Sequence, residues 1–273
     1  MNLDTALPLL ARNPRADLDL AELAFAIARD EYAHLDIEAE MNELIGMARD
    51  VRPRLRGGLE SRVTALQHFL FEELGFHGNE RDYYDPRNSF LNDVLSRRSG
   101  LPISLSVVAM TIGNRAGLSV HGVGLPGHFL VKVVERDQEI ILDPFHGGKI
   151  LSLADCEKLV EGITGSAFLA TPEALESVSP GYIIQRMLIN LRGVYLRKKD
   201  YARAARTIHR LTQLLPEDRS HWRDLGTVLL QSGRPGKAIK HLESYLDSEP
   251  PPEDSRSVRE LLDQARGEVA RWN

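Results

Sequence analysis

Cysteine is almost absent from this sequence of 273 residues, in which Cys156 stands alone. One cysteine cannot form an internal disulfide, which fits a reducing compartment. Long apolar runs are also missing, because no stretch approaches the roughly 18 residues that span a bilayer. The first residues lack the basic segment and the apolar run of a secretory signal. We therefore expect a cytoplasmic protein with no membrane partner.

The sequence also lacks an excess of positive charge and the common ligand-binding motifs. Its net charge is -5 at pH 7, whereas nucleic-acid-binding domains carry a basic surface. No phosphate-binding loop, dinucleotide fingerprint or zinc-type spacing occurs. We expect no nucleic-acid partner, no cofactor and no metal. The 42% of hydrophobic and 27% of charged residues are typical of a globular protein with one large domain or two modest ones.

Apolar positions with helical periodicity dominate the first part of the chain, from about residue 18 to 76. A further helix is expected at 102–116. Pro102 suits its first turn, where a backbone N–H has no partner, and Gly117 suits the position just past its end. Another helix is expected at 153–161.

The pattern changes after Gly117. Three short segments are rich in β-branched residues and are bounded by turn residues, at 119–124, 128–134 and 139–142. This pattern predicts strands, with a hairpin loop at 135–138 between the second and the third.

The C-terminal part is helical and repeats with a period of 34 residues. Leu188, Leu191, Tyr195, Ala204, Ile208, Leu211 and Pro216 recur as Trp222, Leu225, Leu229, Ala238, Leu242, Tyr245 and Pro250. This resembles the tetratricopeptide repeat, although Arg192 takes the place of the consensus glycine in the first copy. A helix at 255–273 is expected to cap the array.

Two functions are open for these repeats. They could support the preceding domain or its oligomer, or they could bind a peptide in a concave groove. In the second case, Arg186 and Arg223, each on the first helix of a repeat, are candidates for binding a peptide carboxylate.

His128 and Asp143 are the candidates for chemistry. In a hairpin centred on the 135–138 loop they lie nearly opposite, and opposed Cβ atoms are roughly 4.5–5.5 Å apart. A carboxylate there can orient an imidazole, as in Cys/Ser–His–Asp triads. As alternatives, both residues could serve the turns, or His121, His128, Asp143 and His146 could bind a metal, although their spacing fits no recognised motif.

Two longer strings carry a family resemblance: LNDVLSRRSGLPISLSVVAMTIGNRAGLSVHGVGLPGHFLVKV and ILDPFHGGKILS. They resemble the SirB family of bacterial proteins over most of residues 35–250. The resemblance implies a transglutaminase-like (papain-like) α+β domain with a small antiparallel sheet, followed by tetratricopeptide repeats. The expected divisions are an N-terminal helical segment at 1–86, the core at 87–175, and two repeats with a capping helix at 180–273.

By this resemblance, His128 and Asp143 match the histidine and aspartate of the superfamily's triad. The usual Gly-X-Cys falls on Gly100-Leu101-Pro102, so the nucleophile position holds proline or shifts to Ser104. Serine in a first helical turn more often satisfies backbone donors. Cys156 is a poor substitute, because the acidic residues on either side of it raise a thiol pKa; we expect it to be buried.

Two hypotheses of function follow. In the first, the chain is a regulatory or scaffold pseudoenzyme that binds a protein or peptide, in keeping with the association of the SirB family with invasion-gene regulation. In the second, it is an amidase or peptidase in which Ser104 attacks, His128 acts as base and Asp143 orients it. The missing cysteine favours the first. The sequence predicts no oligomeric state.

Overall fold

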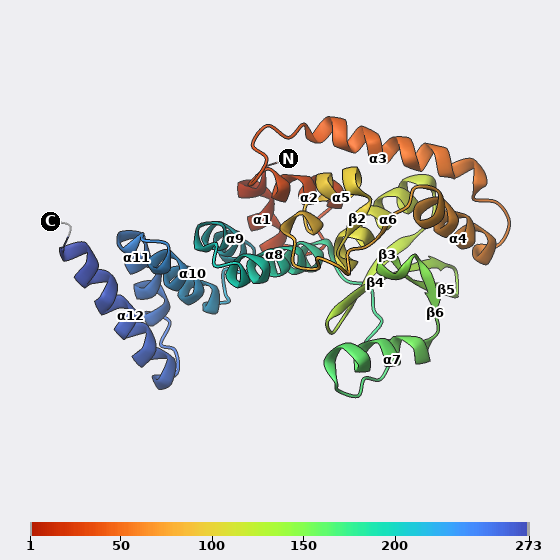
Figure 1. The fold of residues 1–273 in the computed structure, drawn as a ribbon. Coiled ribbons are helices and arrows are strands. Elements are labelled where there is room, and N and C mark those ends of the chain that lie inside the picture. The colour runs from red at the N-terminus through yellow and green to blue at the C-terminus, as the bar shows by residue number, and fades with distance from the viewer. Residues whose placement is uncertain (1, 272–273) are drawn as a thin grey trace. The chain divides into compact units, whose positions relative to one another are not determined.

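Residues 2–271 are described by the computed structural model, and they divide into two units (Figure 1). The first unit consists mainly of Arg15–Met187. The second consists of Asp4–Pro14 and the chain from Leu188 onward. Helix α8 (Pro180–Arg197) runs from the first unit into the second.

The first unit begins with helices whose starts are set by aspartates. Asp19 accepts hydrogen bonds from the first turn of α2 (Leu20–Ala28), and Asp36 does the same for α3 (Ile37–Val51). The remaining elements before the sheet are η1 (Arg52–Arg54), α4 (Leu59–Gln67), the π-helical turn η2 (His68–Glu73), η3 (Pro86–Asn88) and α5 (Leu91–Arg97). The helical prediction for residues 18–76 is therefore confirmed in type, with breaks at 29–36 and 52–58.

Helix α6 (Pro102–Ala116) is the central element of this unit. It packs against α3 and against strands β3 and β4, and most of its side chains are buried. Its bounds agree with the sequence prediction. Gly117 ends it in the left-handed region, at φ 101°, which glycine adopts without steric cost.

Strands β3 (Val120–Leu125), β4 (His128–Glu135), β5 (Gln138–Asp143) and β6 (Lys149–Leu151) form an antiparallel sheet in that order. The first three were predicted, but β6 was not. A short parallel pair, β1 (His77–Gly78) with β2 (Ser99–Gly100), was also missed. Two-residue strands are too short to leave a periodic signal.

The short helix η4 (Pro144–His146) connects β5 with β6, and α7 (Leu153–Thr164) follows β6. Cys156 and Val160 of α7 are buried in a cluster with sheet residues such as Leu130 and Ile141. Helix α7 extends three residues beyond its predicted end, to Thr164, and Gly165 follows it in the left-handed region.

The second unit consists of helices: α1 (Leu3–Arg12), the end of α8, α9 (Tyr201–Leu214), α10 (Ser220–Gln231), α11 (Pro235–Leu246) and α12 (Pro252–Ala270). Gly226 of α10 lies against Leu242 of α11, where an added Cβ would be 2.6 Å from the leucine side chain. Arg192, in the consensus glycine position, instead bonds Asp224 of α10. The capping helix predicted at 255–273 corresponds to α12, although 272–273 lie outside the described residues.

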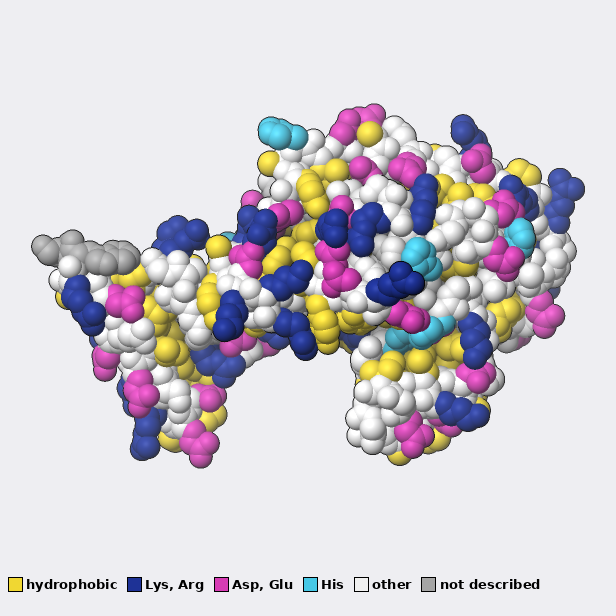
Figure 2. Space-filling view, viewed as in Figure 1, with side chains coloured by type: hydrophobic (Ala, Val, Ile, Leu, Met, Phe, Trp, Pro, Cys, Tyr) yellow, Lys and Arg dark blue, Asp and Glu magenta, His cyan; other side chains and the backbone are white. Residues whose placement is uncertain are grey.

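Charge on the molecular surface is mixed. Lys and Arg side chains are interspersed with Asp and Glu on the face shown in Figure 2, in keeping with the small net charge. Among residues 2–271, the helices are all too short or too polar to cross a membrane.

Candidate functional site

Asp143 is held in place by the turn that follows it. It is the last residue of β5, and Pro144 begins the η4 turn directly after it. Asp143 Oδ1 accepts hydrogen bonds from the backbone N–H groups of Phe145, at 3.0 Å, and His146, at 3.4 Å. The carboxylate is 0% exposed. Local turn chemistry therefore fixes this carboxylate in a buried position.

His128 reaches the same carboxylate from the neighbouring strand. It is the first residue of β4, and its Nε2 lies 3.0 Å from both Oδ1 and Oδ2 of Asp143. The β4–β5 ladder begins at Val131 and Leu142, so the two side chains meet just beyond its end. His128 is 4% exposed. The structure thus brings together the two residues that the sequence singled out.

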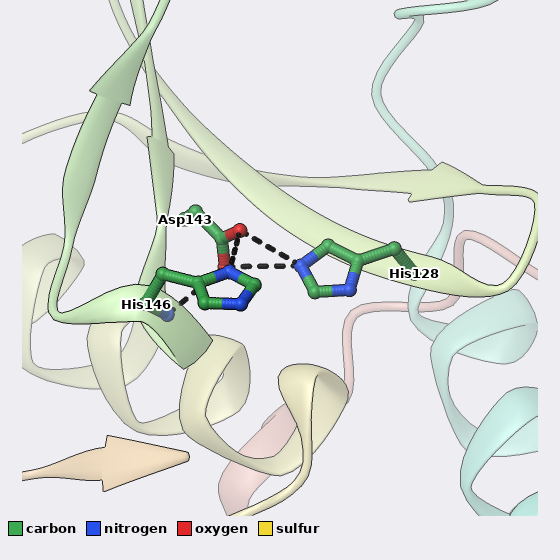
Figure 3. Close-up of side chains that lie close together, drawn as sticks. All are labelled: His128, Asp143 and His146. Atoms are coloured by element: carbon green, nitrogen blue, oxygen red, sulfur yellow. Dashed lines mark hydrogen bonds and ion pairs between the residues drawn. The ribbon is translucent and has the colours of Figure 1, made fainter. Parts of the chain in front are cut away.

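His146 is a third member of this group. Its Nδ1 lies 2.7 Å from Asp143 Oδ2, and its ring stacks on that of His128, with 5.7 Å between centroids. Figure 3 shows both imidazoles turned toward the carboxylate. Phe145 packs edge-on against both rings. The sequence pointed to His146 only as a member of the metal alternative, although the turn expected at Asp143-Pro144 is a signal that could have brought His146 back toward Asp143.

The two histidines determine the ionisation of Asp143. Burial alone would raise the pKa of this carboxyl. The hydrogen bonds from His128 and then His146, with the charges on those rings, outweigh burial and hold the pKa of Asp143 below its ordinary value. Asp143 is therefore a carboxylate at neutral pH.

Ser104 lies on α6 but its hydroxyl is already used by the main chain. Ser104 Oγ donates to the carbonyl of Asn88 at 2.7 Å and accepts from the N–H of Leu101 at 2.9 Å. The residue is 0% exposed. Ser106 is equally buried, and its hydroxyl has no hydrogen-bond partner. Both serines therefore face the protein interior rather than solvent.

Cys156 is buried, as the sequence predicted. Burial is the largest cause that raises the pKa of its thiol to about 11, and the charges of Asp155, Asp143 and Glu157 add to it. At neutral pH the thiol is protonated and weakly nucleophilic.

The two arginine candidates are both engaged within their own units. Arg186 donates to the carbonyls of Leu125, at 3.3 Å, and His128, at 3.1 Å, which flank the β3–β4 turn. These bonds hold the backbone of His128 in place.

Arg223 pairs with Asp224 at 2.9 Å and lies 3.8 Å from Asp254.

His121, the fourth member of the metal alternative, lies apart from this group on β3. Its Nε2 is 2.8 Å from Ser119 Oγ.

A buried helix packed on an antiparallel sheet, with a His–Asp pair at the end of two strands, is the arrangement that a transglutaminase-like domain implies. The model of the transglutaminase-like superfamily matches residues 36–189, and a tetratricopeptide-repeat model matches residues 191–263. The chain belongs to the UPF0162 family within this class: a UPF0162 protein of Xylella fastidiosa is 36% identical over 254 residues, covering 89% of this chain and 88% of that protein.

More distant likenesses extend beyond bacteria. Mouse F-box only protein 21 is 32% identical over 142 residues, which is 49% of this chain and 22% of that protein. Among solved structures, the crystal structure of menin matches with a TM-score of 0.41 and 13% identity, covering 89% of this chain and 74% of that chain. The menin likeness is too slight to support an argument about fold or function.

Proposed function

We propose that this protein is a non-catalytic regulatory or scaffold protein. It combines a transglutaminase-like unit that lacks the superfamily's nucleophile with a tetratricopeptide-repeat unit that binds a protein or peptide. The narrower resemblance to the SirB family, and the regulatory role that it implies, belong to this proposal. The observation that carries it is the bonding of Ser104 Oγ, buried and shared between Asn88 and Leu101.

A nucleophile at the start of a helix needs surroundings that stabilise its ionised form. A cysteine thiolate there is stabilised by the positive end of the helix dipole and by a neighbouring imidazolium. Here the corresponding position is Pro102, which has no such group. For Ser104 to attack a substrate, its hydroxyl would have to give up two hydrogen bonds and become exposed. The interior position of Cys156, with its raised pKa, does not supply a replacement.

A serine-dependent amidase or peptidase is the second candidate, and one observation favours it. The His128–Asp143 pair has the geometry that orients a general base, with Nε2 bonded to the carboxylate. The same pair also serves a structural role, because it ties the end of β4 to the turn after β5. Retention of the pair therefore weighs less than the bonding of Ser104.

For the binding role, the repeat unit offers Arg223. Its 2.9 Å contact with Asp224 is a close ion pair, whereas the 3.8 Å contact with Asp254 is longer. A peptide carboxylate could replace Asp254 without breaking the closer pair. Arg223 also lies over the ring of Tyr245, which fixes the guanidinium plane.

The test is affinity capture by the full-length protein from lysate of its native host. Arg223→Gln removes the positive charge but keeps a neutral, hydrogen-bonding side chain beside Asp224 and Asp254. The variant therefore adds no negative charge that would repel these two aspartates. Arg259→Gln, an exposed residue of α12, is the matched control. We expect at least one captured protein to fall tenfold or more with Arg223→Gln, about 1.4 kcal/mol in affinity, and to be unchanged with Arg259→Gln. Identical capture by all three proteins would refute the role of Arg223.

A further inference from the structure

Three metal-binding side chains converge at the end of β5. One donor atom from each of His128, Asp143 and His146 lies within 4.8 Å of the others. We propose that these three residues form a binding site for a divalent transition-metal ion of the Zn²⁺ type. Partner binding by the repeat unit does not require this site, so the two can be tested separately.

The arrangement of the carboxylate supports this proposal. Asp143 Oδ1 accepts the backbone N–H of Phe145, which fixes the plane of the group. Asp143 Oδ2 is shared by both imidazoles, at 3.0 Å from His128 Nε2 and 2.7 Å from His146 Nδ1. In the metal-free form each of these nitrogens must carry a proton to make its hydrogen bond. A divalent ion can take the place of both protons when each neutral ring carries its proton on the other nitrogen, His128 Nδ1 and His146 Nε2, so that the lone pairs face the ion and the carboxylate stays charged.

The separations of Asp143 Oδ2 from the two ring nitrogens are close to what zinc needs, and the two rings offer donor atoms within 4.8 Å of each other. Ligands at 2.0–2.1 Å in tetrahedral geometry are separated by roughly 3.3 Å, so the 2.7 Å contact of His146 Nδ1 with Asp143 Oδ2 must open by about 0.6 Å, whereas the 3.0 Å contact of His128 Nε2 needs little change. His146 can provide this movement, because its side chain is 43% exposed on a short surface turn. His128 and Asp143 are buried and would stay in place.

The donor set also selects the class of metal. Two imidazole nitrogens and one carboxylate oxygen suit Zn²⁺ and its neighbours in the transition series, whereas Mg²⁺ and Ca²⁺ prefer oxygen alone. Three protein ligands leave one position open for a water molecule. Phe145 lines both rings, and Tyr83 packs against Phe145. An apolar wall of this kind strengthens the attraction between the ion and the carboxylate.

Sequence motifs could not identify this site. The three ligands are fifteen and three residues apart along the chain, and the longer gap is closed by the β4–β5 hairpin. Of the four residues in the metal alternative, the fold brings together three and leaves His121 outside the group.

The proposal is tested by isothermal titration calorimetry, in which Zn²⁺ is added to the full-length protein after treatment with a chelator. We expect saturable binding of one ion per chain. His146→Ala should weaken this binding tenfold or more, because it removes the one exposed ligand. His34→Ala removes an exposed histidine from the loop before α3 and should leave binding unchanged.

A second readout guards against a folding defect in the variant. Zn²⁺ should raise the melting temperature of the wild-type and His34→Ala proteins but not that of His146→Gln, which keeps a polar side chain of similar size. The proposal is overturned if the wild type shows no saturable one-to-one binding. It is also overturned if His146→Ala, or His146→Gln in the thermal assay, behaves as the wild type does.

Discussion

Two serines on helix α6 have opposite environments, which predicts opposite effects when each is replaced by alanine. Ser104 and Ser106 are both 0% exposed. Ser104 Oγ bonds the backbone of Asn88 and Leu101, while Ser106 Oγ has no partner. We predict that Ser104→Ala destabilises the first unit and that Ser106→Ala leaves its stability unchanged or raises it.

The magnitudes follow from the hydrogen bonds. A buried hydrogen bond contributes about 1 kcal/mol net, and a partner left unsatisfied costs about 1–3 kcal/mol. After Ser104→Ala, the N–H of Leu101 keeps a longer contact of 3.3 Å with the carbonyl of Asn88. The expected loss is therefore about 2 kcal/mol. Ser106→Ala removes an unsatisfied hydroxyl and should gain about 0–1 kcal/mol.

Urea unfolding of the two variants, monitored by circular dichroism, measures both effects under one set of conditions. The two free energies of unfolding should differ by about 2–3 kcal/mol, with Ser104→Ala the less stable. Equal losses in both variants would refute the reasoning. A larger loss for Ser106→Ala would refute it as well, and would mean that the hydroxyl of Ser106 has a partner.

Two further predictions concern the buried thiol and the repeat packing. Because burial raises the pKa of Cys156 from 9.0 to about 11, the stability that wild type holds relative to Cys156→Ala is complete below about pH 9. This difference in the free energy of unfolding should fall by at most about 3 kcal/mol as the pH rises toward 11, because the thiol ionises at a lower pH in the unfolded chain than in the folded one. Urea midpoints of both proteins at about pH 8 and pH 10.5 measure it, and an equal difference at the two pH values would contradict the prediction. Gly226→Ala should destabilise the repeats by about 1–3 kcal/mol, because its Cβ would be 2.6 Å from Leu242. Gly236→Ala, whose Cβ meets nothing closer than 4.0 Å, should be neutral or stabilising. Thermal melts of the two variants compare these effects, and similar losses of stability for both would contradict the packing argument.

Local signals in the sequence predicted the central elements well. Pro102 and Gly117 mark the two ends of α6 as the structure has them, because each residue has a backbone preference that acts without help from the rest of the fold. The strands before Asp143 were predicted for a similar reason, since short segments rich in β-branched residues stand between clear turn residues. Strand β6, in contrast, has three residues and exists because β5 offers an edge to pair with.

The candidate site shows where local reasoning stops. Hairpin geometry predicted that His128 and Asp143 lie close together, although the β4–β5 ladder ends at Val131 and Leu142 and the two residues are not directly paired. The role of Arg186 could not be predicted in this way, because its bonds to the carbonyls of Leu125 and His128 join segments about 60 residues apart. Likewise, the bond from Ser104 to the carbonyl of Asn88 depends on a loop sixteen residues earlier in the chain. Such long-range contacts leave no periodic pattern in the sequence.

If the His128–Asp143 pair has no nucleophile to activate, the native protein should resist covalent labelling. The native full-length protein is treated with a fluorophosphonate and, separately, with iodoacetamide, and its intact mass is measured. We expect no adduct with either reagent until the protein is unfolded in urea, when Cys156 should react with iodoacetamide. A stoichiometric fluorophosphonate adduct on Ser104 of the native protein, lost in His128→Ala, would contradict this expectation.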